Sequence, residues 1–294
     1  MVSPKEIIQE AVAALVIATG IARAARAWLW RDRVAILLYH DPDPTTLDRH
    51  LGYLRGICDL VPLEDITLPG AGRPRAVITL DDGHEGNAKL LPVFVKHQVR
   101  PTIFLCSGIV GRPRTHWWLH PGAMEAGIER LKRLTNGQRL AELEAYGYRQ
   151  DEDDRATGLS IEQLEAMRPY VDFQAHSRFH PVLTRCTDTE CEDEIATSNH
   201  EIEALVRNPC THFAYPNGNY GDREVELVKA AGYKSARTCD IGWNDRSSDP
   251  FRLRTIIIDD SGSTRWFAAQ LTGIPLFFRY LRQGGGWAGR FPQF

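Results

Sequence analysis

The sequence predicts an α/β fold, a barrel of parallel strands that alternate with helices. The chain has 294 residues, of which 43% are hydrophobic and 25% charged; this suffices for one large barrel or two smaller domains, and we favour the single domain. Short apolar runs rich in β-branched residues recur between stretches of helical spacing. Polar residues gather directly after these runs, which is typical of a barrel whose active site lies at the carboxyl ends of its strands.

Seven runs have the character of buried strands and set the order of the elements. They cover residues 34–40, 76–80, 102–106, 171–175, 211–215, 233–238 and 252–258. Apolar residues at helical spacing predict helices between them, at residues 46–57, 87–97, 189–206 and 222–232. Residues 120–169 contain three further helical patterns, the last of them opened by Ser160 with Gln163 behind it. We interpret this region as a helical insertion between two barrel strands.

The two ends of the chain lie outside this alternating pattern. We assign residues 1–33 to an N-terminal amphipathic helix, residues 34–262 to the catalytic barrel and residues 263–294 to a C-terminal helix and tail. The apolar centre of the first segment, residues 11–22, is shorter than the roughly 18 residues that a membrane-spanning helix needs. Acidic residues follow Lys5 closely, so a secretory signal, and with it a secreted or periplasmic protein, is the less favoured interpretation.

Arginines and tryptophans follow the apolar centre, and residues 274–282 have the same character. Such segments suit helices that lie on a membrane surface. We therefore expect a cytoplasmic protein with a peripheral membrane contact through both ends. Packing of these helices on the barrel or on a partner subunit is the alternative.

Charge and cysteine content exclude some classes of protein. The formal net charge is −3 and the sequence has no dense block of Lys and Arg, so we expect no nucleic-acid partner. The six cysteines form no Cys-x-x-Cys pair, which argues against a zinc ribbon and a redox motif. Free thiols in a reducing compartment fit this pattern best, and surface disulfides are the alternative.

Two adjacent acids, Asp81 and Asp82, follow the apolar strand 76–80. Neighbouring carboxylates repel each other, so the pair is most easily tolerated if one binds a cation and the other handles a proton. Two histidines four residues apart, His176 and His180, follow the strand 171–175 and can present their nitrogens to one metal. Two imidazoles and one carboxylate leave open positions on a zinc-like ion, as a hydrolase requires.

Three segments resemble, in order and spacing, the motifs of the polysaccharide deacetylase family, the NodB-homology carbohydrate esterases. They are Thr79-Leu80-Asp81-Asp82-Gly83, His176-Ser177-Arg178-Phe179-His180 and Phe213-Ala214-Tyr215-Pro216-Asn217-Gly218. The resemblance covers residues 34–259 and implies a distorted (β/α)7 barrel with a divalent metal, commonly zinc, that removes acyl groups from N-acylated amino sugars. It also implies that Asp81 is the base and that Asp82, His176 and His180 are the metal ligands.

The sequence departs from the family pattern at three points. No histidine follows His212, so the late Leu-x-His motif that often supplies the general acid is missing. His40, at a neighbouring strand exit, is our candidate for this role, and a histidine that bonds its own loop is the alternative. The arginine that pairs with the catalytic acid is missing from its usual place. Arg254 is our candidate, with a surface salt bridge as the alternative, and His84 stands where an aromatic residue is more usual.

The substrate site is predicted from two further segments. Tyr215, Pro216 and Asn217 form the turn whose backbone N–H stabilises an oxyanion, and Pro216 has no N–H to give. Trp117 and Trp118 offer faces on which sugar rings stack, with core packing as the alternative.

The sequence therefore predicts a metal-dependent hydrolase that removes an N-acyl group, N-acetyl in the favoured case. Its expected substrate is an amino sugar of a surface polysaccharide or of a lipid-linked glycan precursor, and Zn²⁺ is the favoured ion. Two alternatives stay open: a hydrolase of another non-peptide C–N bond, and an inactive glycan-binding protein on the same barrel.

Overall fold

The protein forms a closed barrel of seven parallel strands. The computed structural model describes residues 4–66, 72–152 and 154–275. The strands are β1 (Val34–Tyr39), β3 (Arg75–Leu80), β4 (Thr102–Leu105), β5 (Asp172–Ala175), β6 (His212–Ala214), β7 (Ser235–Ile241) and β8 (Leu253–Ile257). They pair in the order β1-β8-β7-β6-β5-β4-β3, and β1 pairs with β3 to close the barrel. The short strand β2 (Asp59–Leu60) extends the sheet beyond β3. The predicted distorted (β/α)7 barrel is confirmed.

Residues along each strand point alternately into and out of the barrel, and this alternation divides the core. In β1, Ala35 and Leu37 belong to the large core between strands and helices, whereas Val34 and Ile36 belong to a smaller cluster with Val77, Phe104, Ala214 and Leu253. All six residues of β1 are buried. A parallel strand covered on both faces therefore has a continuous apolar sequence, which is why the strands were predictable.

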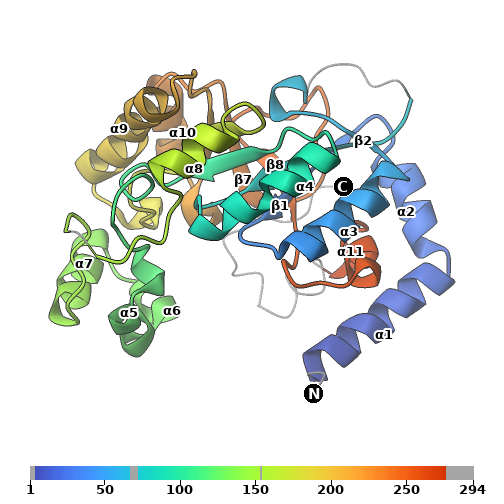
Figure 1. The fold of residues 1–294 in the computed structure, drawn as a ribbon, viewed down its shortest axis with the longest axis horizontal. Coiled ribbons are helices and arrows are strands. Elements are labelled where there is room, and N and C mark those ends of the chain that lie inside the picture. The colour runs from blue at the N-terminus through green and yellow to red at the C-terminus, as the bar shows by residue number, and fades with distance from the viewer. Residues whose placement is uncertain (1–3, 67–71, 153, 276–294) are drawn as a thin grey trace.

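Helices surround the barrel strands (Figure 1). They are α3 (Pro44–Arg55), α4 (Leu91–Lys96), α8 (Ile161–Met167), α9 (Asp188–Val206) and α10 (Asp222–Ala230), with short 3-10 turns η1 (Leu63–Asp65), η2 (Glu85–Leu90), η4 (Leu183–Arg185) and η5 (Pro216–Gly218). Side chains fix several helix starts: Ser160 and Gln163 form a capping box at α8, and Thr187 and Glu190 form another at α9.

The predicted insertion between β4 and β5 has a small core of its own. It contains η3 (Trp117–Leu119), α5 (Pro121–Ala126), α6 (Ile128–Leu131) and α7 (Asn136–Ala145), which stand beside the barrel in Figure 1. Trp117, Leu131, Leu143 and Tyr148 form the centre of this core. The insertion thus places α6 and η3 next to the strand ends.

The N-terminal segment contains two helices where one was predicted: α1 (Pro4–Ala18) and α2 (Ile21–Leu29). Gly20 separates them in a left-handed conformation with φ +75°, which glycine adopts without steric cost. Ala13 of α1 and Ala22 of α2 pack with Trp266 of α11 (Thr264–Gln270). This contact agrees with the alternative of packing on the barrel, yet other apolar side chains of the two helices remain exposed: Ile7, Ile8, Leu15, Ile17, Ile21 and Trp28.

Among the described helices, none alone has the length and hydropathy of a membrane span; α1 and α2 meet those criteria together, but they are bent by 71°. Most of the second amphipathic segment, residues 276–282, lies outside the described residues.

Candidate active site

Asp81 and Asp82 leave the end of β3 through a tight turn. The backbone N–H of Asp81 donates to the carbonyl of Tyr39 at 3.0 Å, which continues the β1–β3 pairing to this point. Asp82 and Gly83 then adopt φ values of +71° and +70°. A side chain at position 83 would clash, because its Cβ would lie 2.5 Å from Leu105 Cδ2. The sequence Asp-Asp-Gly therefore suits a turn that presents both carboxylates at the barrel mouth.

His176 and His180 lie on the loop after β5, and α9 holds that loop in place. The Glu194 carboxylate accepts the backbone N–H groups of Arg178 and Phe179 at 2.8 and 2.9 Å, and the N–H of His180 donates to Ser177 Oγ at 3.1 Å. Burial raises the pKa of Glu194, and these hydrogen bonds oppose the rise. The first residues of α9, from Asp188 to Glu194, are rich in acidic side chains, and such a run at a helix start is usually solvated. Glu194, however, is only 7% exposed and points toward the loop that carries His176 and His180.

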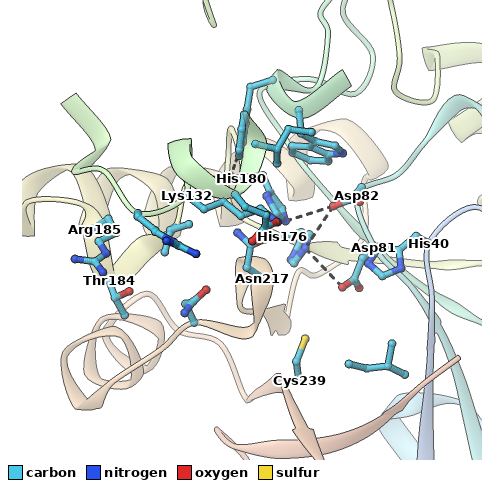
Figure 2. A pocket seen from close by; sticks show the side chains of 18 of the residues that line it. His40, Asp81, Asp82, Lys132, His176, His180, Thr184, Arg185, Asn217 and Cys239 are labelled. Atoms are coloured by element: carbon cyan, nitrogen blue, oxygen red, sulfur yellow. Dashed lines mark hydrogen bonds and ion pairs between the residues drawn. The ribbon is translucent and has the colours of Figure 1, made fainter. Parts of the chain in front are cut away.

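Asp82, His176 and His180 converge on one point. Asp82 Oδ1 lies 3.6 Å from His176 Nε2 and 3.5 Å from His180 Nε2 (Figure 2). This oxygen is buried and has no hydrogen-bond partner among the described residues. His176 Nδ1 donates to the carbonyl of Ala214 at 2.8 Å, so its Nε2 lone pair faces the other two donors. Two imidazoles and an unpartnered carboxylate oxygen fit a divalent metal of the zinc type, with positions left open.

Two histidines to which the sequence analysis assigned no role, His84 and His116, form hydrogen bonds with Asp82. His84 Nε2 lies 3.0 Å from Asp82 Oδ2, and His116 Nε2 donates to the Asp82 carbonyl at 3.2 Å. Burial disfavours a charged His84, but the hydrogen bond and charge of Asp82 raise the pKa of His84 above its usual value. One oxygen of Asp82 is thus held by His84, while the other faces His176 and His180. The histidine at position 84, where an aromatic residue is more usual, was the signal in the sequence for the contact with Asp82.

Asp81 forms a buried ion pair with Arg237 of β7, which corrects the prediction for Arg254. Both Asp81 oxygens accept from Arg237 Nη2, and the two residues are 3% and 1% exposed. Arg254 stands at the start of β8, the end of the barrel away from Asp81, and its backbone N–H donates to Asn244. A charged residue inside the buried strand 235–241 was the signal for Arg237, because a buried charge needs a partner.

A cavity of about 910 Å³ opens over these groups. Of the predicted residues, His40, Asp81, Asp82, Trp117, Trp118, His176, His180 and Asn217 line it, whereas Tyr215, Pro216 and Arg254 do not. Figure 2 shows His40 beside Asp81, on the side away from His180. The backbone of His40 is engaged, because its N–H donates to Asp260 and its carbonyl accepts from Asn87. Its imidazole is thereby presented to the cavity.

Some of the residues predicted to bind substrate face the cavity, and others are buried and form contacts within the protein. Trp118 is half-buried and borders the cavity, with its ring 4.5 Å from that of His180. Trp117 is 1% exposed, and its indole N–H donates to the His180 carbonyl, so core packing describes it better than sugar stacking. The Tyr215 side chain is buried and its hydroxyl donates to the Phe251 carbonyl. Its backbone N–H donates to the Arg237 carbonyl. Its side chain and its N–H are therefore both used within the protein.

Asn217 is the residue of this turn that faces the cavity. It adopts φ +54°, and its side-chain Nδ2 is buried without a hydrogen-bond partner among the described residues. A buried amide donor without a partner costs free energy unless a ligand satisfies it. Asn217 therefore offers a donor to a bound molecule.

The fold and the site together define a barrel hydrolase, and comparisons with known proteins identify the family. A family model described as polysaccharide deacetylase matches residues 70–236, more than half of the chain. The chain belongs to the polysaccharide deacetylase family. A comparison with curated proteins found no match.

Solved structures share the fold at low identity. The Streptococcus pyogenes deacetylase PplD, in complex with acetate, has 17% identity and a TM-score of 0.60, and the match covers 82% of this chain and 98% of that one. IcaB from Ammonifex degensii has 17% identity and a TM-score of 0.57, with 82% and 96% covered. The putative polysaccharide deacetylase BA0330 from Bacillus anthracis has 17% identity and a TM-score of 0.58, with 82% and 69% covered.

Proposed function

We propose that this protein is a metal-dependent deacylase that removes the N-acetyl group from an amino sugar. Family membership supports deacetylation of a polysaccharide. The observation that carries the finer proposal is the placement of Asp81, held by Arg237, directly beside the converging donors of Asp82, His176 and His180. One carboxylate then binds the metal while the other is free for proton transfer.

The proposed metal is Zn²⁺, held by Asp82 Oδ1 and the two ligand histidines. When bound, such an ion supplies Lewis acidity, which polarises the acyl carbonyl and lowers the pKa of a water molecule. The hydrogen bonds of His84 to Asp82 and of His176 to Ala214 orient these donors.

The remaining steps belong to side chains at the cavity. Asp81 accepts the proton of the attacking water, and the ion pair with Arg237 holds this carboxylate in place. The Asn217 amide donates to the oxygen on which negative charge develops, because its Nδ2 is buried beside the cavity and has no hydrogen-bond partner among the described residues. His40, which lines the cavity beside Asp81, returns a proton to the departing amine nitrogen. Trp118 stacks on the sugar ring.

Other features of the structure support two further proposals: where the protein is located, and that its glycan substrate is linked to a lipid. All six cysteines are free and buried, which supports a cytoplasmic protein. Exposed apolar side chains on α1 and α2, and an apolar groove lined by Ile21, Trp28, Leu29 and Ile274, support peripheral contact with a lipid surface and hence a lipid-linked glycan substrate. Reduced binding of a Trp28→Ser variant to phospholipid vesicles would test the contact; unchanged binding would contradict it.

Acetate release from N-acetylglucosamine oligomers tests the function. We expect release by the wild-type protein and loss of release in Asp81→Asn with zinc content unchanged. No release by the wild type from any acylated glycan favours a glycan-binding protein, and release of acyl groups from small amides alone favours another C–N hydrolase. Arg237 pairs with Asp81 in place of the arginine that the sequence lacks at its usual position, which supports an active enzyme over a glycan-binding protein.

A further inference from the structure

We propose that the substrate carries a negative charge, a phosphate or a carboxylate, which Lys132, Arg133 and Arg185 bind at the cavity rim. This inference rests on the proposed function and names the class of its substrate. The three cations line the same cavity as the catalytic groups. In Figure 2, Lys132 and Arg185 stand on the side of the cavity opposite Asp81 and His40. The anion would therefore be bound at some distance from the scissile amide.

Two elements that are far apart in sequence bring these cations together. Lys132 and Arg133 follow α6 of the insertion, and Arg185 ends the short turn η4 on the loop beyond His180. Neither element is needed to close the barrel. Their meeting at the cavity mouth is a property of the tertiary structure.

The charges on this rim are largely uncompensated. Arg133 and Arg185 are exposed and form no ion pair with any described residue, whereas the neighbouring Arg130 is paired with Glu142. Lys132 Nζ lies 2.9 Å from Glu129, the one carboxylate among the rim residues of this side. Three cations therefore face one anion, in a chain whose formal net charge is −3. Such a local excess of positive charge attracts an anionic ligand.

The chemistry and the space both suit a charged glycan. The guanidinium fork of arginine matches a phosphate or carboxylate with two parallel hydrogen bonds. The cavity of about 910 Å³ lies near the upper end of the range for small-molecule sites, so an amino sugar and a second charged unit fit together. The phosphate would come from a lipid-linked precursor and the carboxylate from a uronic acid in the polymer.

Binding to the Asp81→Asn variant of the full, zinc-loaded chain tests the inference without relying on turnover. The probes are neutral chitotetraose, a hyaluronan tetrasaccharide that carries carboxylates, and N-acetylglucosamine linked to a short prenyl phosphate. We expect one anionic probe to bind at least about tenfold more tightly than chitotetraose, and the preference to weaken as salt screens the rim. The preferred probe identifies the source of the charge.

Arg133→Gln and Arg185→Gln should each weaken binding of the preferred probe about five- to twentyfold and leave chitotetraose unaffected. Arg246→Gln is the matched control, because Arg246 is exposed and lies near Arg75 at the start of β3, the other end of the barrel. Equal binding of neutral and anionic probes, or equal effects of all three variants, would overturn the inference. The wild-type protein could also bind the probes in a charge-dependent way and release no acetate from any of them. That result would contradict the proposed function but support the anion site.

Discussion

Arg237 and Asp81 form an ion pair beneath the cavity, although 156 positions separate them in the sequence. The Arg237 guanidinium lies over the ring of Phe104, 5.1 Å from its centroid, and is buried inside the barrel, whereas Asp81 lines the cavity above it. Removing the cation from a buried ion pair strongly destabilises the folded protein, because the carboxylate is left as an uncompensated buried charge. The pair therefore serves both stability and the chemistry of Asp81.

Replacement of Arg237 should show both roles. Arg237→Met leaves a buried, unpaired Asp81, and we expect a loss of about 3 to 5 kcal/mol in the free energy of unfolding, with activity reduced to background. The double variant Arg237→Met, Asp81→Asn should recover part of the stability but none of the activity. Urea denaturation and acetate release measure the two effects; a single variant as stable as the wild type would contradict the account.

Glu194 is expected to set metal affinity from outside the ligand set. Glu194→Ala removes the acceptor for the N–H groups of Arg178 and Phe179, which frees the loop that carries both ligand histidines. We expect zinc affinity to fall about 10- to 100-fold. Glu192→Ala, on an exposed face of the same helix, is the control and should bind zinc as the wild type does. Equal zinc affinity in the two variants would show that the loop holds its shape without Glu194.

The role of His40 can be separated from that of the base by the choice of leaving group. An amine must be protonated to depart, whereas p-nitrophenolate leaves without a proton. His40→Gln should therefore lower kcat for an N-acetyl substrate by about 100-fold or more and have a much smaller effect on hydrolysis of p-nitrophenyl acetate. Equal losses on both substrates would assign His40 to positioning and not to proton transfer.

Stability should fall in acid because His50 is buried in its neutral form. Burial lowers the pKa of His50 to about 4, and its ring is stacked on Phe267 and bonded to the Gly262 carbonyl. The unfolded chain takes up a proton near the ordinary pKa of 6.5, but the folded protein does not. The stability contribution is therefore complete above pH 6.5 and is lost as the pH falls toward 4.

This loss amounts to about 2 kcal/mol between about pH 7 and pH 4.5. His50→Gln removes the titration, so its unfolding free energy should depend less on pH over this interval. Urea denaturation at the two pH values measures the difference. A variant that follows the pH dependence of the wild type would assign the acid sensitivity to other groups.

The strands and the convergence of Asp82, His176 and His180 were predictable because their signals are local. A parallel strand buried on both faces is a continuous apolar run; Asp82 and His176 come within two residues of the end of such a run, and His180 lies four residues beyond His176 on the same loop. Arg237 and Glu194 escaped prediction for one physical reason: what each side chain touches is decided by barrel closure and helix packing, not by its neighbours in sequence. From the sequence alone, Arg254 was as good a candidate for the partner of Asp81 as Arg237. In the structure it lies at the start of β8, whereas Asp81 lies at the carboxyl end of β3. Gly20, by contrast, was a local signal for the break between α1 and α2.

The most direct test of the account is a zinc titration of the chelated protein, with acetate release from an N-acetylated glycan as the readout. Chelated wild-type protein should be inactive, and activity should return and level off at one zinc ion per chain, whereas His176→Ala should recover none at that ratio. Full activity in the chelated protein, or recovery in His176→Ala equal to that of the wild type, would contradict the central claim that Asp82, His176 and His180 hold the catalytic metal beside Asp81.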